Sequence, residues 1–99
     1  MDKTPTNKKK TIQEQVFDGL GFEEYEFETP DTGKFICYKG PDGCFYRIHT
    51  NSAEESVIEY ADTEKEAQTN DFWDAEWFDG DPETIVAQMR AALMEYIEQ

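Results

Sequence analysis

Basic residues are scarce in this sequence, with 9 Lys and Arg against 23 Asp and Glu and a formal net charge of −14. Proteins bind DNA and RNA through basic side chains that neutralise phosphates, so direct nucleic-acid binding is not expected. No apolar run approaches the roughly 18 residues of a transmembrane helix. The charged N-terminus is not followed by the apolar stretch of a signal peptide. These absences predict a cytoplasmic protein without a membrane partner.

Side chains with catalytic chemistry are also few, since the chain has a single histidine, His49, and two cysteines. Catalysis needs a nucleophile or an acid–base pair within reach. His49 and Cys44 are five residues apart on one predicted strand, so they should point to opposite faces. A zinc site would lack a fourth ligand, and no calcium-loop or nucleotide-binding motif occurs. We therefore expect no catalytic residue, no metal, no cofactor and no enzymatic activity.

The two cysteines, Cys37 and Cys44, flank a predicted turn. They would lie directly across a hairpin if Tyr38 paired with Gly43, at a separation slightly too long for a disulfide. A cytoplasmic location favours reduced thiols. Two reduced residues in a sheet are expected, with a disulfide as the alternative.

Acidic residues dominate the chain after its first ten positions. Residues 1–10 contain Lys3, Lys8, Lys9 and Lys10 and are predicted to form a flexible basic tail. Residues 11–99 hold 22 acidic against 5 basic residues, a net charge of −17, and are predicted to form a single acidic domain. Solubility of a small domain needs a net charge of only about 2–8. The excess favours a cationic partner.

The sequence predicts a helix at each end of this domain. Thr11 and Glu14 fit a capping box at the start of a helix over residues 11–19, with an apolar stripe that includes Val16. Asp81 and Pro82 fit the first positions of a second helix that extends to the C-terminus. Its apolar residues recur every four positions: Ile85, Met89, Leu93 and Ile97. That spacing is typical of an amphipathic helix packed on a core.

Short strands separated by turn residues are predicted between the helices, at residues 24–28, 34–38, 44–49, 56–61 and 71–78. Residues 62–70 are expected to be a loop or one helical turn. The predicted fold class is α+β: an antiparallel sheet of four to five strands, with the C-terminal amphipathic helix packed on one face and a short N-terminal helix at one end.

Residues 54–83 contain 12 acidic residues and one basic residue, Lys65. On the fifth strand, strict alternation predicts that Trp73, Ala75 and Trp77 face the core. The opposite face would then present acids with aromatic residues between them. The predicted partner-binding residues are Glu59, Asp71, Phe72, Asp74, Glu76, Phe78 and Asp79, with a second row of Glu24, Glu26 and Glu28.

Such rows have a physical rationale as imitations of nucleic acid. Alternate residues of a strand are about 6.7 Å apart, which is comparable to the separation of phosphates along DNA. Carboxylates at this spacing can engage the Arg and Lys that normally hold phosphates, and aromatic residues can anchor the contact. The alternative is that these acids are merely solvated, as on many sheet surfaces.

The sequence thus predicts a small inhibitor that occupies the nucleic-acid-binding surface of a basic partner protein. In size and charge the chain is similar to the small phage-encoded inhibitors of CRISPR effectors and restriction enzymes. That similarity is one of composition, and no motif carries site residues over. The alternative is an immunity or adaptor protein that binds one cognate partner, such as a basic toxin nuclease. An enzyme is a remote third possibility.

Overall fold

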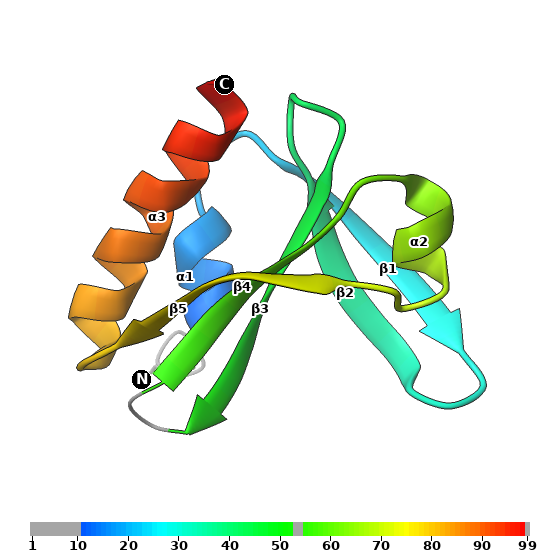
Figure 1. Cartoon of the computed structure of the whole chain (residues 1–99), viewed down its shortest axis with the longest axis horizontal. Coiled ribbons are helices and arrows are strands. Elements are labelled where there is room, and N and C mark those ends of the chain that lie inside the picture. The colour runs from blue at the N-terminus through cyan, green and yellow to red at the C-terminus, as the bar shows by residue number, and fades with distance from the viewer. Residues whose placement is uncertain (1–10, 53–54, 99) are drawn as a thin grey trace, which may run out of the picture.

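The helices and strands occur where the sequence predicts them, and of the two alternatives for residues 62–70, a loop or one helical turn, the helical one forms (Figure 1). The computed structural model describes residues 11–52 and 55–98, so the predicted tail over residues 1–10 lies outside the described residues. The elements are α1 (Ile12–Phe17), β1 (Glu23–Thr29), β2 (Gly33–Lys39), β3 (Phe45–Ser52), β4 (Glu55–Ala61), α2 (Glu64–Gln68), β5 (Trp73–Asp79) and α3 (Pro82–Glu98).

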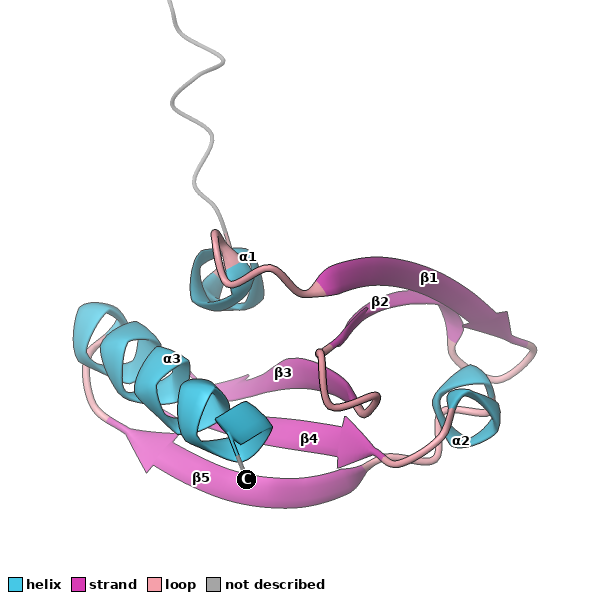
Figure 2. Cartoon of the chain, turned by 90° about the horizontal axis from the view of Figure 1, so that it is seen from above, coloured by secondary structure: helices cyan, strands magenta, loops and turns pink. Residues whose placement is uncertain are grey.

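The five strands form one antiparallel sheet in chain order, β1-β2-β3-β4-β5. Figures 1 and 2 show α1 and α3 at one end of the twisted sheet and α2 at the other. The predicted α+β fold is therefore confirmed. We call the side of the sheet that carries Ile58 the α3 face, because Ile58 packs in one core with α1 and α3. The opposite side, which carries Phe45 and Ala61, is the α2 face, because these residues pack with Ala67 of α2.

The predicted apolar stripe of α3 covers the α3 face. Three of its residues are fully buried in the core with Ile58: Ile85, Met89 and Leu93. The start of the helix is also as predicted, since the Asp81 carboxylate accepts hydrogen bonds from the Thr84 hydroxyl at 2.7 Å and from its backbone N–H at 3.4 Å. None of the helices within the described ranges has the length and apolar character needed to span a membrane.

Two capping boxes stabilise the short helices. In α1, Thr11 Oγ1 accepts from the Glu14 backbone N–H at 3.1 Å, and Glu14 Oε1 accepts from the Thr11 N–H at 2.8 Å, as predicted. The same reciprocal pair forms between Thr63 and Glu66 at the start of α2. This second box explains why five residues suffice for a helix there, because two free backbone donors are satisfied at once.

The sheet opens between β2 and β3. These strands pair only at Tyr38–Tyr46 and Lys39–Phe45, next to their turn, and then diverge (Figure 1). The side-chain amide of Gln13, from α1, bridges the gap. Its Nε2 donates to the Ile36 carbonyl at 3.4 Å, and its Oε1 accepts from the Ile48 N–H at 2.7 Å. The Gln13 side chain thus takes the place of a direct backbone hydrogen bond between β2 and β3.

The prediction of which β5 side chains face the core is wrong. Alternation places Trp73 and Trp77 beneath α3, but 57% and 48% of their surfaces are exposed. Phe78, predicted on the outer face, is buried in the core with α3. Phe72, also predicted outside, is partly buried against the core of the α2 face.

A β-bulge at Ala75 explains the positions of Trp77 and Phe78. Trp73 lies on the predicted face but is not covered by α3, and Phe72 is partly buried because the α2 face has a core of its own. Glu59 pairs with Asp74 and Ile58 with Glu76, so Ala75 has no partner on β4. One extra residue reverses the alternation of faces across the bulge. The α3 face of β5 therefore carries Trp73, Glu76 and Phe78, and its α2 face carries Asp74, Trp77 and Asp79.

Candidate protein-binding surface

The outermost strand β5 presents the largest exposed apolar side chains among the described residues. β5 is an edge of the sheet, and Trp73 and Trp77 project from its two faces into solvent. Tryptophan is enriched among the residues that dominate binding energy at protein interfaces. The bulge disfavours simple strand-to-strand pairing along this edge. A partner is therefore expected to contact β5 through its side chains rather than through backbone hydrogen bonds.

Carboxylates surround these tryptophans. Asp74 and Asp79 are exposed on the same face of β5 as Trp77, and Asp71 is exposed just before the strand. Glu55 of β4 pairs with Asp79. β5 itself contains no Lys or Arg. We call Asp71, Trp73, Asp74, Trp77 and Asp79 the β5 edge.

Four of the predicted partner-binding residues make contacts within the protein. Phe72 packs against the core of the α2 face and under Arg47. Phe78 is buried. Glu76 lies on the α3 face, where its Oε1 accepts a hydrogen bond from the Tyr96 hydroxyl at 2.6 Å. Glu59 forms a 2.6 Å ion pair with Arg47. The structure therefore does not bring the predicted set together as one outer face.

Arg47 is the centre of a polar and aromatic cluster on the α2 face. Its Nε donates to Glu59, and its Nη1 donates to Asn70 Oδ1 at 2.6 Å. Its guanidinium carbon lies 4.0 Å from the ring centroid of Phe72 and 5.4 Å from that of Phe35. Charge-assisted hydrogen bonds and cation–π contacts hold this group together. Arg47 forms part of a cleft of about 550 Å³ where β2 and β3 diverge.

The second predicted row is exposed as expected. Glu24, Glu26 and Glu28 share the α3 face of β1, because they alternate with Tyr25 and Phe27, which pack on the α2 face. β1 pairs with β2 without a bulge, so this row keeps the regular spacing of about 6.7 Å. We call these three glutamates the β1 row.

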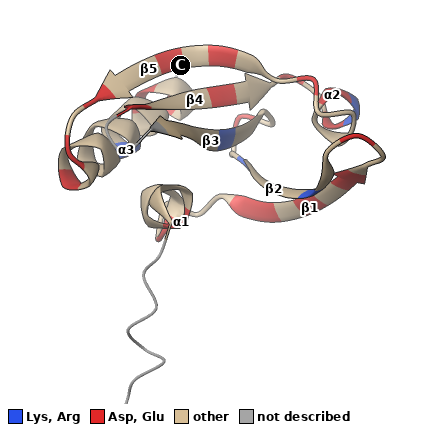
Figure 3. Cartoon of the chain, turned by 90° about the horizontal axis from the view of Figure 1, so that it is seen from below, with Lys and Arg blue, Asp and Glu red and all other residues tan. Residues whose placement is uncertain are grey.

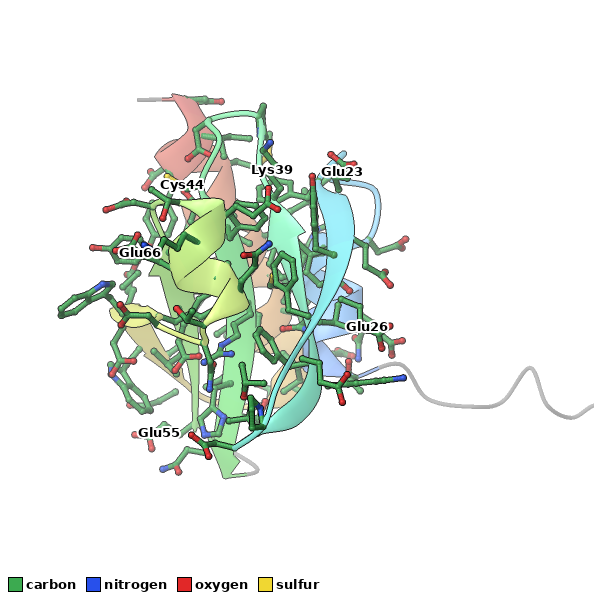
Figure 4. The ribbon with its side chains drawn as sticks, turned by 90° about the vertical axis from the view of Figure 1, so that its right-hand side faces the viewer. Glu23, Glu26, Lys39, Cys44, Glu55 and Glu66 are labelled. Carbon is green, nitrogen blue, oxygen red and sulfur yellow. The ribbon has the colours of Figure 1, made fainter. Side chains whose placement is uncertain are left out.

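The β1 row and the β5 edge are separate surfaces. β1 and β5 are opposite edges of the sheet, and Figure 3 shows their acidic bands on opposite sides of the molecule. Figure 4 likewise shows Glu26 on β1 far from Glu55, which pairs with β5. One flat partner surface cannot contact both rows at once.

The β1 row continues into a groove that the sequence did not indicate. Glu24 and Glu26 line it together with Glu14 of α1 and the ring of Tyr38, around a volume of about 390 Å³. Burial and the charges of Glu24 and Glu14 raise the pKa of Tyr38. Glu14 joins this surface only because α1 folds back beside the sheet, which no local pattern reveals.

The two cysteines are free thiols and lie on opposite faces of the sheet. Cys37 is buried in the core of the α2 face, and Cys44 packs against the core of the α3 face. Tyr38 pairs with Tyr46 rather than Gly43, so the two thiols are not across a hairpin. Burial raises the pKa of the Cys37 thiol to about 11, which keeps it protonated and unreactive at neutral pH.

His49 is exposed and pairs with Val57 on the α2 face, so it points away from Cys44, as predicted. In the ranges that the structure describes, no three His, Cys, Asp or Glu side chains converge in a way that could hold a metal ion.

No family model matches this chain, and no curated protein or solved structure matches it either. The function has to be inferred from the chain's own surface chemistry.

Proposed function

We propose that this protein binds a basic, nucleic-acid-binding protein through the β5 edge and inhibits it by occupying the surface that holds nucleic acid. The observation that carries the proposal is the exposure of Trp73 and Trp77 on a strand whose own charged residues are all acidic. Burying an aromatic anchor supplies binding energy. Carboxylates beside it select a partner rich in Lys and Arg and repel an acidic one.

The net charge of −17 over residues 11–99 supports the same partner class. A charge of this size raises the rate of encounter with a basic protein at low ionic strength. The β1 row lies on the far side of the sheet, so we assign it to this long-range attraction rather than to the contact itself. Binding, not catalysis, is proposed because Cys37 is buried and His49 and Cys44 lie on opposite faces.

The test is a pull-down with the tagged full chain from a lysate of its source cells, with and without excess double-stranded DNA. We expect a nucleic-acid-binding protein to be retained and to be displaced by DNA. The triple variant D71N/D74N/D79N should weaken its binding by about tenfold, because exposed ion pairs each contribute about 0.2–1 kcal/mol. W77A should weaken it by about 30-fold or more, as for an aromatic hot spot.

The control is E24Q/E26Q/E28Q, which removes the same number of charges from the β1 row. Equal losses for the two triple variants would contradict the assignment of the contact to the β5 edge. Glu76 is left unchanged in these variants because it accepts a hydrogen bond from Tyr96.

The exposed tryptophans also support a second candidate, an immunity or adaptor protein specific for one partner. Contacts made only by exposed charges weaken steeply with salt, whereas a packed aromatic interface weakens less. Retention of one partner in high salt, unaffected by DNA, would favour this function over nucleic-acid mimicry.

A further inference from the structure

A small pocket opens on the α3 face beside the β5 edge. It has a volume of about 250 Å³ and is lined by Cys44, Tyr46, Tyr60, Asp62, Ala75 and Tyr96. We call it the tyrosine pocket; Figure 4 labels Cys44, near the C-terminal end of α3. The bulge contributes to it directly, because the unpaired residue Ala75 forms part of the wall with only a methyl group. Trp73 pairs with Tyr60, so the pocket adjoins an exposed tryptophan.

The tyrosines are held in place by carboxylates. The rings of Tyr46 and Tyr96 are nearly parallel, with centroids 6.2 Å apart and planes inclined by 20°. The Tyr46 hydroxyl donates to Asp42 Oδ2 at 2.6 Å, and the Tyr96 hydroxyl donates to Glu76 Oε1 at 2.6 Å. Burial, together with these hydrogen bonds, raises the pKa of both phenols. Both rings therefore stay neutral at physiological pH.

The charged residues that line this pocket or bind its tyrosine hydroxyls are all acidic. Asp62 lines it and is exposed, while Asp42 and Glu76 bind two of its tyrosine hydroxyls. None of the residues that line it is Lys or Arg. Aromatic faces attract cations, and the attraction strengthens when water is partly excluded. A cationic group gains both from the rings and from the carboxylates, whereas an anion is repelled.

We infer that the tyrosine pocket receives the side chain of one Lys or Arg from the basic partner, while the partner's main chain passes over Trp73. This inference rests on the proposed function, since it assigns a specific contact within the β5 edge interface. It also distinguishes that interface from a diffuse acidic surface, because one cation is desolvated in a defined place. The small residue at the bulge is what leaves room for that side chain.

The pocket is tested without the partner, by titrating the ¹⁵N-labelled full chain with Nα-acetyl-arginine methylamide and Nα-acetyl-lysine methylamide. We expect saturable shifts of the backbone amides of Asp62 and Ala75 with at least one of the two probes. The uncharged probe Nα-acetyl-norleucine methylamide should bind about 2- to 30-fold more weakly, the range of a cation–π contribution. Equal binding of the uncharged probe would overturn the inference.

Two variants locate the binding. A75L should abolish the saturable shifts by filling the pocket, whereas A87L makes the same change at an exposed position of α3 and should leave them unchanged. D62N should weaken binding about 1.5- to 5-fold, as for an exposed ion pair. D31N makes the same change at an exposed position of the turn between β1 and β2 and should leave binding unchanged. The inference that the tyrosine pocket binds a cationic side chain would be refuted if the probes still bound to the A75L variant. It would also be refuted if neither cationic probe gave a saturable shift.

The same measurements separate this inference from the proposed function. If the partner binds the β5 edge but neither cationic probe shifts the pocket, only the inference fails. If a probe binds and A75L abolishes it, yet no basic partner is retained, the pocket stands as a cation site and the proposed function fails.

Discussion

At the scale of single residues, Arg47 shows why an acidic chain keeps one of its few cations inside. Its side chain is only 21% exposed and that of Glu59 only 16%. Glu59 and Asn70 satisfy two of its nitrogens, and Phe72 covers the plane of the guanidinium. Because Asn70 and Phe72 come from the segment after α2, this one side chain ties that segment to β3.

We predict that R47M will destabilise the protein by about 1–3 kcal/mol, because it leaves Glu59 as a partly buried carboxylate without its partner. Methionine keeps much of the aliphatic stem, so the loss reports mainly on the charged contacts. Urea unfolding followed by circular dichroism measures the change. K65M, at an exposed position of α2, should change stability by less than about 0.5 kcal/mol. Similar values for the two variants would contradict the role given to Arg47.

At the scale of elements, the divergence of β2 and β3 makes the sheet depend on α1. The two strands share only two residue pairs, whereas β1 and β2 are paired along their whole length. Gln13 supplies the missing contact by accepting from one strand and donating to the other. The short helix α1 is therefore part of the sheet's hydrogen bonding as well as of its core.

We predict that Q13A will destabilise the protein by about 1–2 kcal/mol, because it leaves partly buried backbone groups of β2 and β3 without partners. Hydrogen exchange of the Ile48 amide should become faster, since its acceptor is lost. Q13E keeps that acceptor but loses the donor to Ile36, so it should protect Ile48 better than Q13A. The control is Q68A, at an exposed position of α2. If Q68A accelerated hydrogen exchange of the Ile48 amide as much as Q13A, the proposed role of Gln13 in linking β2 to β3 would be contradicted.

In the molecule as a whole, the negative charge of the acidic side chains is concentrated along two opposite edges of the sheet, β1 and β5. Figure 3 shows acidic bands along β1 and β5, with few basic positions between them. Separating the two rows lowers the repulsion between them, but within each row the carboxylates remain close. Such repulsion destabilises the compact state, and dissolved salt screens it.

We predict that raising sodium chloride from low to about physiological ionic strength will increase the melting temperature by roughly 4–8 °C, which corresponds to about 1 kcal/mol for a domain of this size. E24Q/E26Q/E28Q should melt higher than the parent protein at low salt and gain less from added salt. Calorimetry measures both effects. A melting temperature independent of salt would show that repulsion among these carboxylates does not limit stability.

Elements whose signals are local can be predicted from the order of the residues alone. The box of Thr11 and Glu14, the cap at Asp81 and the fourfold apolar spacing of α3 each predict a helix correctly, because each depends on residues within one or two turns. The alternation in β1 also predicts its outward glutamates correctly, since β1 is a regular strand. The capping box of Thr63 and Glu66 is an equally local signal, from which the start of α2 can also be predicted.

The exposure of individual β5 side chains depends on how the strand pairs and packs in the folded protein. A period of two assigns faces when a strand pairs regularly, but the bulge at Ala75 arises from how β5 pairs with β4. That single unpaired residue turns Trp77 outward and Phe78 inward. The tyrosine pocket and the bridge by Gln13 likewise join residues far apart in the chain. Such contacts depend on the relative placement of whole elements, which short-range patterns do not encode.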